Sequence, residues 1–252
     1  MLTVLLTALG VGGATAIGTL IGLLFRRPSH KFNDAILSFA GGVMLCASIV
    51  GLIIPSIDAT NNWSILITVI GVFVGAIVLN LIDKLVPHMH KLTGVEIESH
   101  PDSAKKLSRV LLFVIAIAIH NFPEGIAAGV GFATGDQSHA LIVAGGIALQ
   151  NIPEGMVIIA PMLASGISKK RTVLIALATG FIEVIGTFIG YFAGSISTAI
   201  LPFALAFAGG TMLYVVSDEM IPETHAHGNE RLATYALLVG FSVMLAFDFL
   251  LG

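Results

Sequence analysis

Eight long runs of almost uncharged residues constrain this chain more than any other feature. Each run has about 18 residues or more, which is enough for an α-helix to cross roughly 30 Å of hydrocarbon. Charged residues make up only 11% of the 252, whereas a soluble domain carries about a quarter. The sequence therefore predicts an all-α polytopic membrane protein with eight transmembrane helices. They lie at about residues 2–25, 33–57, 63–86, 108–133, 139–164, 171–195, 199–222 and 231–251.

The twelve Lys and Arg residues predict which connections face the cytosol. They lie in or beside the first, third, fifth and seventh connections, and the other connections and both termini have none. Because Lys and Arg are retained on the cytoplasmic side, we expect both termini outside. No basic segment precedes the run at 2–25, so we interpret it as a retained helix and not as a signal peptide. The basic residues form no continuous face, which argues against nucleic-acid binding.

One long connection divides an otherwise compact chain. We expect a single transporter domain over 1–252, with a first repeat at about 1–86, a cytoplasmic loop at about 87–107, a central helix pair at about 108–164 and a second repeat at about 171–252. The loop carries His88, His90 and His100, which form either a surface that captures metal or ordinary solvated residues. The single cysteine, Cys46, excludes an internal disulfide and is interpreted as a packing residue.

Two internal repeats indicate an inverted architecture. IAIHNFPEGIAAG (117–129) and IALQNIPEGMVII (147–159) align without gaps in consecutive spans, which run in opposite directions. A weaker repeat relates GGVML (41–45) to GGTML (209–213), in the second and seventh spans. The pattern predicts three helices, a central pair and three inverted counterparts. Transporters of this plan bind their ligand near the midplane, where helices are interrupted.

Both central motifs place polar side chains in the middle of a span. His120 and Glu124 share a helix face at i,i+4, and Asn121 lies on nearly the same face. The second motif repeats this geometry with Gln150, Asn151 and Glu154. Pro123 and Pro153 lack a backbone donor and should loosen their helices locally, and Gly125 and Gly155 should allow close helix approach.

Buried carboxylates without a basic partner are the strongest functional signal. An ionised residue at the bilayer centre costs about 2.5–3.5 kcal/mol, and Glu124, Glu154 and Glu183 have no Lys or Arg inside any span. Protonation, water or a bound cation would each relieve this cost. Carboxylates with a histidine and amides suit first-row divalent ions. A protonated structural role stays open for Glu183, and Met44 is either a soft ligand or a core residue. His30 and His139 are expected to have no special role.

HNFPEG followed by QNIPEG in adjacent spans resembles the ZIP (Zrt/Irt-like) metal transporters, especially their bacterial branch. The resemblance covers essentially the whole chain and implies a three-plus-two-plus-three inverted bundle with a binuclear site. It places one metal on Met44, His120, Glu124, Gln150 and Glu154. It places the second on Asn121, Glu124, Asn151, Glu154 and Glu183.

The resemblance also implies what the protein does. It implies uptake of Zn²⁺, and also of iron, manganese, cobalt or cadmium, across a bacterial inner membrane by an elevator-like movement, without enzymatic activity. It further implies a homodimer, for which Gly71 and Gly75 offer a face. We expect the ion to enter past Asp58 and to leave by a path along the residues Asp218, Glu219, Glu223, His225 and His227.

Two other functional classes compete with metal transport. An intramembrane zinc protease needs the motif HExxH, which the sequence lacks, and a lipid-pyrophosphate phosphatase would use Arg inside the spans. A proton- or sodium-coupled carrier of a small solute, with titrating glutamates, is the remaining alternative to metal transport.

Overall fold

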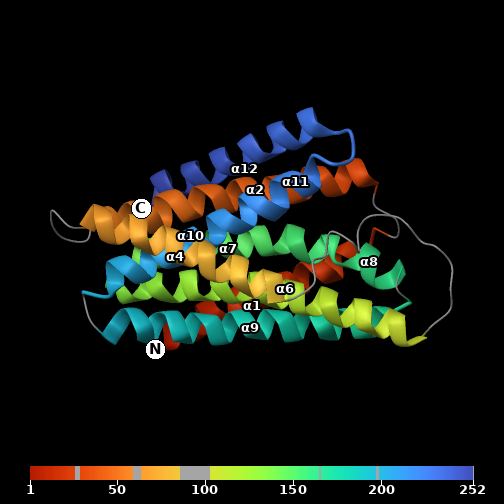
Figure 1. Ribbon diagram of the computed structural model, residues 1–252, viewed down its shortest axis with the longest axis horizontal. Coiled ribbons are helices and arrows are strands. Elements are labelled where there is room, and N and C mark those ends of the chain that lie inside the picture. The colour runs from red at the N-terminus through yellow and green to blue at the C-terminus, as the bar shows by residue number, and fades with distance from the viewer. Residues whose placement is uncertain (26–28, 59–63, 86–102, 165, 197–198, 252) are drawn as a thin grey trace.

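Long helices joined by short turns make up the described part of the chain. The computed structural model describes residues 1–25, 29–58, 64–85, 103–164, 166–196 and 199–251 (Figure 1). The helices are α1 (Leu2–Gly22), α2 (His30–Ser48), η1 (Ile49–Ile53), α3 (Ile54–Asp58), α4 (Ser64–Leu85), α6 (Ser103–Ala133), α7 (Gln137–Val157), α8 (Ile159–Ala164), α9 (Lys169–Ile196), α10 (Leu201–Val215), η2 (Val216–Met220), α11 (Ile221–Thr224) and α12 (Glu230–Leu251). The elements η1 and η2 are π-helical turns.

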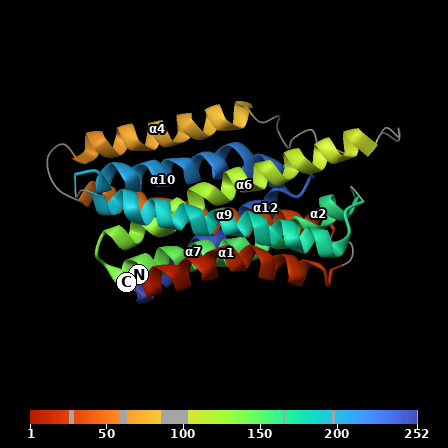
Figure 2. The ribbon, with the colours of Figure 1, turned by 90° about the horizontal axis from the view of Figure 1, so that it is seen from below.

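The predicted membrane spans coincide with these helices. Seven segments of the described chain are long and apolar enough to cross a membrane, namely Leu2–Gly22, His30–Asp58, Ile65–Ile82, Gln137–Val157, Lys169–Ile196, Leu201–Thr224 and Glu230–Leu251. The predicted span at 108–133 lies within α6, whose 31 residues are also long enough. The prediction of an all-α polytopic membrane protein is confirmed. Both termini lie at one end of the molecule (Figure 2), as an even number of crossings requires. We call it the outer end, after the orientation that the Lys and Arg residues predict.

The helices pack as two groups. The helices α1, α6, α7 and α9 pack on one another and form what we call the site bundle. The helices α2, α4, α10 and α12 form the frame bundle, through the pairs α2–α12, α4–α10 and α2–α10. The turns η1 and η2, which follow α2 and α10, belong to it as well. In Figure 1, α12 and α2 lie along the top and α1 and α9 along the bottom. The bundles meet where α2 packs on α7 and α10 on α6.

Glycines bring backbones into direct contact inside each bundle. A Cβ atom on Gly18 of α1 would lie 2.0 Å from the carbonyl oxygen of Ile152 in α7. In the frame bundle, a Cβ atom on Gly42 of α2 would lie 2.0 Å from the carbonyl oxygen of Leu237 in α12. Small residues at such positions replace the hydrophobic effect as the means of joining helices in lipid. Each bundle is therefore held by close backbone packing.

Side chains, not backbones, meet the glycines at the interface between the bundles. A Cβ atom on Gly51 would meet Cγ2 of Val143 at 2.7 Å, and one on Gly146 would meet Sδ of Met244 at 2.6 Å. These contacts join η1 to α7 and α7 to α12 through groups that can change rotamer.

Gly71 and Gly75 do not form a dimer face. A Cβ atom on Gly71 would lie 2.6 Å from Cβ of Ala206, and one on Gly75 would lie 2.3 Å from the carbonyl oxygen of Phe207. Both glycines therefore face α10 of the same chain, and the prediction that they serve a second copy is wrong. The small-xxx-small spacing marks a close helix pair without saying whether the partner helix belongs to another molecule.

The inverted repeat extends to helices that the sequence analysis did not pair. Residues 17–22 of α1 read IGTLIG, and residues 185–190 of α9 read IGTFIG. Their contacts correspond, because Gly18 meets the carbonyl oxygen of Ile152 and Gly186 meets that of Phe122, at equivalent positions of the two central motifs. The repeat between α2 and α10 is also longer than GGxML, since LSFAGGVML (37–45) matches LAFAGGTML (205–213).

The π-helical turns among the described residues lie in the second and seventh spans. Pro123 and Pro153 lie inside continuous α-helices, so the expected local loosening of the central helices does not interrupt them. The π-helical turns η1 and η2 instead precede Pro55 and Pro222, each in an Ile-Pro pair. A proline removes the donor for the carbonyl four residues earlier, and a π-turn is one way to absorb that loss.

Candidate metal centre

The central motifs come together because α6 and α7 are adjacent and antiparallel. Gly135, with φ at 84°, permits the tight turn between them, since a left-handed backbone favours glycine. A Cβ atom on Gly125 would lie 2.3 Å from the carbonyl oxygen of Glu183, and one on Gly155 would lie 2.1 Å from that of Thr15. The prediction of close helix approach at both glycines is confirmed. This packing brings α9 and α1 alongside the two motifs.

Glu183 is buried and accepts hydrogen bonds at both carboxylate oxygens. Asn121 Nδ2 donates to Oε1 at 2.5 Å and Asn151 Nδ2 donates to Oε2 at 2.6 Å. Thr15 Oγ1 also donates to Oε1, at 3.1 Å. Hydrogen bonds to a charged group are among the stronger ones, so polar donors offset part of the cost of burial without any cation. Hydrogen-bond donors of the protein itself thus relieve the cost that was expected to need protonation, water or a cation.

Glu124 is buried too, but only half of its carboxylate has a partner. Gln150 Nε2 donates to Oε1 at 2.8 Å. The other oxygen, Oε2, has no hydrogen-bond partner, and neither has Oε1 of Gln150 or Oδ1 of Asn151. Unsatisfied buried oxygens are rare in proteins and call for an explanation. These three are all acceptors, so the cluster offers lone pairs to a cation or a hydrogen-bond donor.

His120 faces a residue that was expected on the exit path. Its Nε2 atom lies 2.7 Å from Oε2 of Glu219 in η2, and the two side chains are 18% and 19% exposed. Glu154 is half-buried and interacts electrostatically with both His120 and Glu219. Glu124 in turn interacts with Glu154 and Glu183. Glu154 and Glu219 thus lie near one histidine, and Glu124 and Glu183 extend the acidic cluster through Glu154.

Amide oxygens are needed to complete a ligand set. Among the described residues, no three His, Cys, Asp or Glu side chains converge as a metal site on their own. The carboxylate Oε2 of Glu124 and the amide oxygen Oε1 of Gln150 are unpartnered and are hard donors suited to divalent ions. Met44 is fully buried in the apolar core with Ile147 and Val143, which leaves its two interpretations open.

The remaining predicted residues lie at the ends of the helices. Asp58 is exposed at the end of α3, and Asp218 accepts from the hydroxyl of Tyr214 at 3.2 Å. His225 Nδ1 lies 2.8 Å from the carbonyl oxygen of Ile221. Glu223 is half-buried. His88, His90 and His100 lie outside the described residues.

His227 belongs to a separate polar cluster at the inner end. Its Nδ1 atom lies 3.0 Å from Oδ1 of buried Asp34, to which Asn229 also donates. The rings of His30 and His227 are 4.7 Å apart. Together these contacts tie the start of α2 to the turn before α12.

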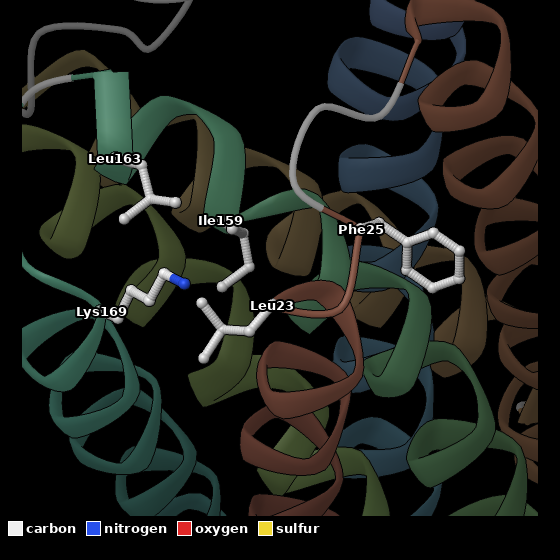
Figure 3. Close-up of a pocket in the computed structure, with 5 residues that line it drawn as sticks. All are labelled: Leu23, Phe25, Ile159, Leu163 and Lys169. Atoms are coloured by element: carbon white, nitrogen blue, oxygen red, sulfur yellow. The ribbon is translucent and has the colours of Figure 1, made fainter.

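A hollow at the inner end of α1 is distinct from the cluster. It measures about 420 Å³ and is lined by Leu23, Phe25, Ile159, Leu163 and Lys169 (Figure 3). The amine of Lys169 points toward its middle (Figure 3). The side chains that line it include one amine and no carboxylate, so this hollow offers a cation no acidic ligand.

Sequence reasoning missed Thr15 and Asp34. Thr15 occupies the position in α1 that Glu183 occupies in α9, because IGTLIG and IGTFIG follow each of them at the same distance. That repeat was the available signal for Thr15. Asp34 had no motif around it, and its partners lie on a distant turn.

Comparisons with known proteins find zinc transporters along most of the chain. A family model described as ZIP Zinc transporter matches residues 88–248. Zinc transporter ZIPB of Bordetella bronchiseptica is 39% identical over 95% of this chain and 78% of its own length. Zinc transporter GufA of Myxococcus xanthus is 41% identical over 98% of each chain. Zinc transporter ZupT of Chlorobaculum parvum is 36% identical over 92% of this chain and 91% of its own.

Proposed function

We infer that this chain, which belongs to the ZIP zinc transporter family, carries divalent metal ions across a bacterial inner membrane through the cluster on α6 and α7. The unpartnered oxygens of Glu124, Gln150 and Asn151 carry this inference. They are acceptors in a buried place where a lone pair without a partner is costly. A dication passing through would satisfy them while it is bound. The relatives are named zinc transporters, which favours Zn²⁺ over an organic solute and its coupled proton.

The first metal position uses the unpartnered oxygens. We assign it to Met44, His120, Glu124, Gln150 and Glu154. For Gln150 to ligate, its Oε1 oxygen faces the ion while the ion replaces the hydrogen bond that Nε2 now makes to Glu124. The imidazole of His120 leaves Glu219 and supplies the one borderline nitrogen, which suits Zn²⁺ and its first-row neighbours.

The second position is harder to occupy. It would use Asn121, Asn151 and Glu183, with Glu124 and Glu154 shared. Both oxygens of Glu183 already accept from amides and a hydroxyl, so a second ion has to displace these donors. We therefore propose that the first position fills first. We also propose iron, manganese, cobalt and cadmium as substrates, because these oxygen-rich ligands suit them too.

The exit begins at Glu219. Once His120 binds the ion, Glu219 is an acceptor that already lies beside this histidine, and its side chain is 19% exposed. Asp218, Glu223, His225 and His227 offer weaker contacts from there to the cytosol. Weak successive sites favour release, since tight binding would slow turnover.

The two bundles support an elevator-like movement. The site bundle holds its helices by backbone contacts, whereas its interface with the frame bundle is made by side chains. Sliding at the interface with the frame bundle therefore breaks fewer backbone contacts than sliding within the site bundle would. We also propose that the chain divides into a first repeat at about 1–86, a central pair at about 108–164 and a second repeat at about 171–252. We further propose that it forms a homodimer.

Substitution of the two central glutamates tests the transport site. In proteoliposomes loaded with a zinc-sensitive dye, Glu124→Ala and Glu154→Ala should lower zinc flux at least about tenfold, because each removes a charged ligand. Glu230→Ala is the matched control, since Glu230 is exposed in the first turn of α12. Normal flux in either variant, with normal insertion, would refute the assignment. A pH dye in parallel liposomes separates metal flux from proton flux.

A further inference from the structure

The backbone donor that an α-helix would supply to the carbonyl group of Gly51 is absent. In an α-helix the donor would be the backbone N–H four residues later, which here is Pro55, and proline has none. The side chain of His139 takes this place, with Nε2 at 2.9 Å from the Gly51 oxygen. Gly51 lies in η1 of the frame bundle and His139 in the first turn of α7 in the site bundle. The bond therefore joins the two bundles.

Gly51 also packs tightly against a second side chain of α7. A Cβ atom there would lie 2.7 Å from Cγ2 of Val143, which follows His139 by one helical turn on the same face of α7. Gly51 thus contacts the imidazole of His139 through its carbonyl group and the isopropyl group of Val143 through its Cα. Asp136 fixes the start of α7, since its side chain accepts from the backbone N–H of His139 at 3.0 Å.

This contact lies between the metal centre and the outer end. His139 precedes Gln150 by eleven positions, which places it about 16 Å further out along α7. The intervening Val143 and Ile147 are fully buried together with Met44 and Leu52. On the inner side, by contrast, His120 and Glu219 are 18% and 19% exposed. The described structure is closed toward the outer end.

We propose that His139 is a positioning residue that latches this closed state through its hydrogen bond to the Gly51 carbonyl. Opening toward the outside separates α7 from η1, so the bond has to break in every transport cycle. The inference rests on the proposed function, because a latch on the outer side matters only if ions pass there. His139 does not have to touch the ion.

The chemistry of the latch predicts which substitutions preserve it. The Nε2–H group is the donor, so His139→Leu removes the bond while it keeps much of the side-chain volume. His139→Gln retains an N–H donor at a similar reach. Pro55→Ala restores a backbone N–H four residues after Gly51, and this donor competes with the imidazole for the same carbonyl.

Thiol labelling measures opening without any metal. The natural cysteine, Cys46, is replaced by Cys46→Ser, and Ala47→Cys places a reporter at a fully buried position facing α7. A membrane-impermeant methanethiosulfonate is added from the outside to spheroplasts in the presence of a chelator. His139→Leu should raise the labelling rate about two- to tenfold, the population shift expected for one hydrogen bond. His139→Gln and the control His30→Leu should stay within about twofold of the background.

Two results would overturn the latch. One is an unchanged labelling rate in a correctly inserted His139→Leu protein, and the other is an equal rise in His139→Gln. If His139→Leu fails to insert, Pro55→Ala is measured instead, and the latch predicts faster labelling than in the background. Because no metal is present, these rates stand apart from the flux test of Glu124 and Glu154, and either proposal can fail alone.

Discussion

At the scale of single residues, two buried carboxylates solve the same electrostatic problem differently. Glu183 accepts from two amides and a hydroxyl, whereas Glu124 keeps one oxygen without a partner. A satisfied carboxylate fixes the helices that supply its donors, and an unsatisfied one attracts a cation. We therefore expect Glu183 to position the site more than it holds the first ion.

Thr15 tests the positioning role of Glu183. Thr15→Val keeps the shape but removes the donor at 3.1 Å, and we expect the free energy of unfolding to fall by about 1–2 kcal/mol. Thr179→Val is the matched control, because that buried hydroxyl bonds a carbonyl one turn away in its own helix. Thermal unfolding in detergent measures both, and equal losses would contradict the role of Thr15.

At the scale of helices, position decides what a glycine or a proline does. Gly18 lies against the backbone of α7, whereas Gly13 of the same helix has no atom within 4 Å of a built Cβ. Pro123 and Pro153 lie inside α-helices that continue past them, whereas Pro55 and Pro222 each follow a π-turn. The residue type alone does not distinguish these cases.

The two glycines of α1 form a matched pair. Gly18→Ala should destabilise the protein by about 2 kcal/mol or more, because its Cβ would have to displace a backbone oxygen 2.0 Å away. Gly13→Ala should be neutral or stabilise by up to about 1 kcal/mol through helix propensity. Since Cys46 is the single cysteine and is buried, its reactivity toward a thiol dye on heating reports unfolding. Similar midpoints for the two variants would contradict this packing.

At the scale of the whole molecule, the division into two bundles is the main functional feature. Backbone contacts join α1 to α7 and α9 to α6, whereas side chains make the glycine contacts between this site bundle and the frame bundle. The hydrogen bond of His139 to Gly51 and the pair of His120 with Glu219 both cross this interface. Relative sliding of the bundles would alter access to the site from the two sides in turn.

Disulfide cross-links test whether the bundles move. In a Cys46→Ser background, Gly51→Cys with Val143→Cys joins the bundles, and Gly131→Cys with Ala140→Cys joins α6 to α7 inside one bundle. The Cβ separations of 3.8 and 3.6 Å suit disulfides. Oxidation should abolish zinc flux in the first pair and leave most of it in the second, with reduction restoring flux. Undiminished flux through the oxidised first pair would exclude the movement.

The spans and the central motifs were readable from local patterns. Apolar runs locate membrane helices because lipid demands a fully hydrogen-bonded backbone, and these runs coincide with the observed helices. The motif residues gather because the tight turn at Gly135 makes α6 and α7 neighbours. The pairing of α1 with α9 was also present in the sequence, as IGTLIG and IGTFIG, although their separation in the chain hid it.

Sequence alone determined that this chain crosses a membrane, that it contains an inverted repeat and that acidic residues without basic partners lie within its spans. Each of these depends on composition or spacing along one segment. Tertiary structure decided that Glu183 is satisfied by Thr15, Asn121 and Asn151, that Glu219 reaches His120 and that Gly71 faces α10. Such pairings join segments far apart in the chain, and only the packing of helices against one another selects them.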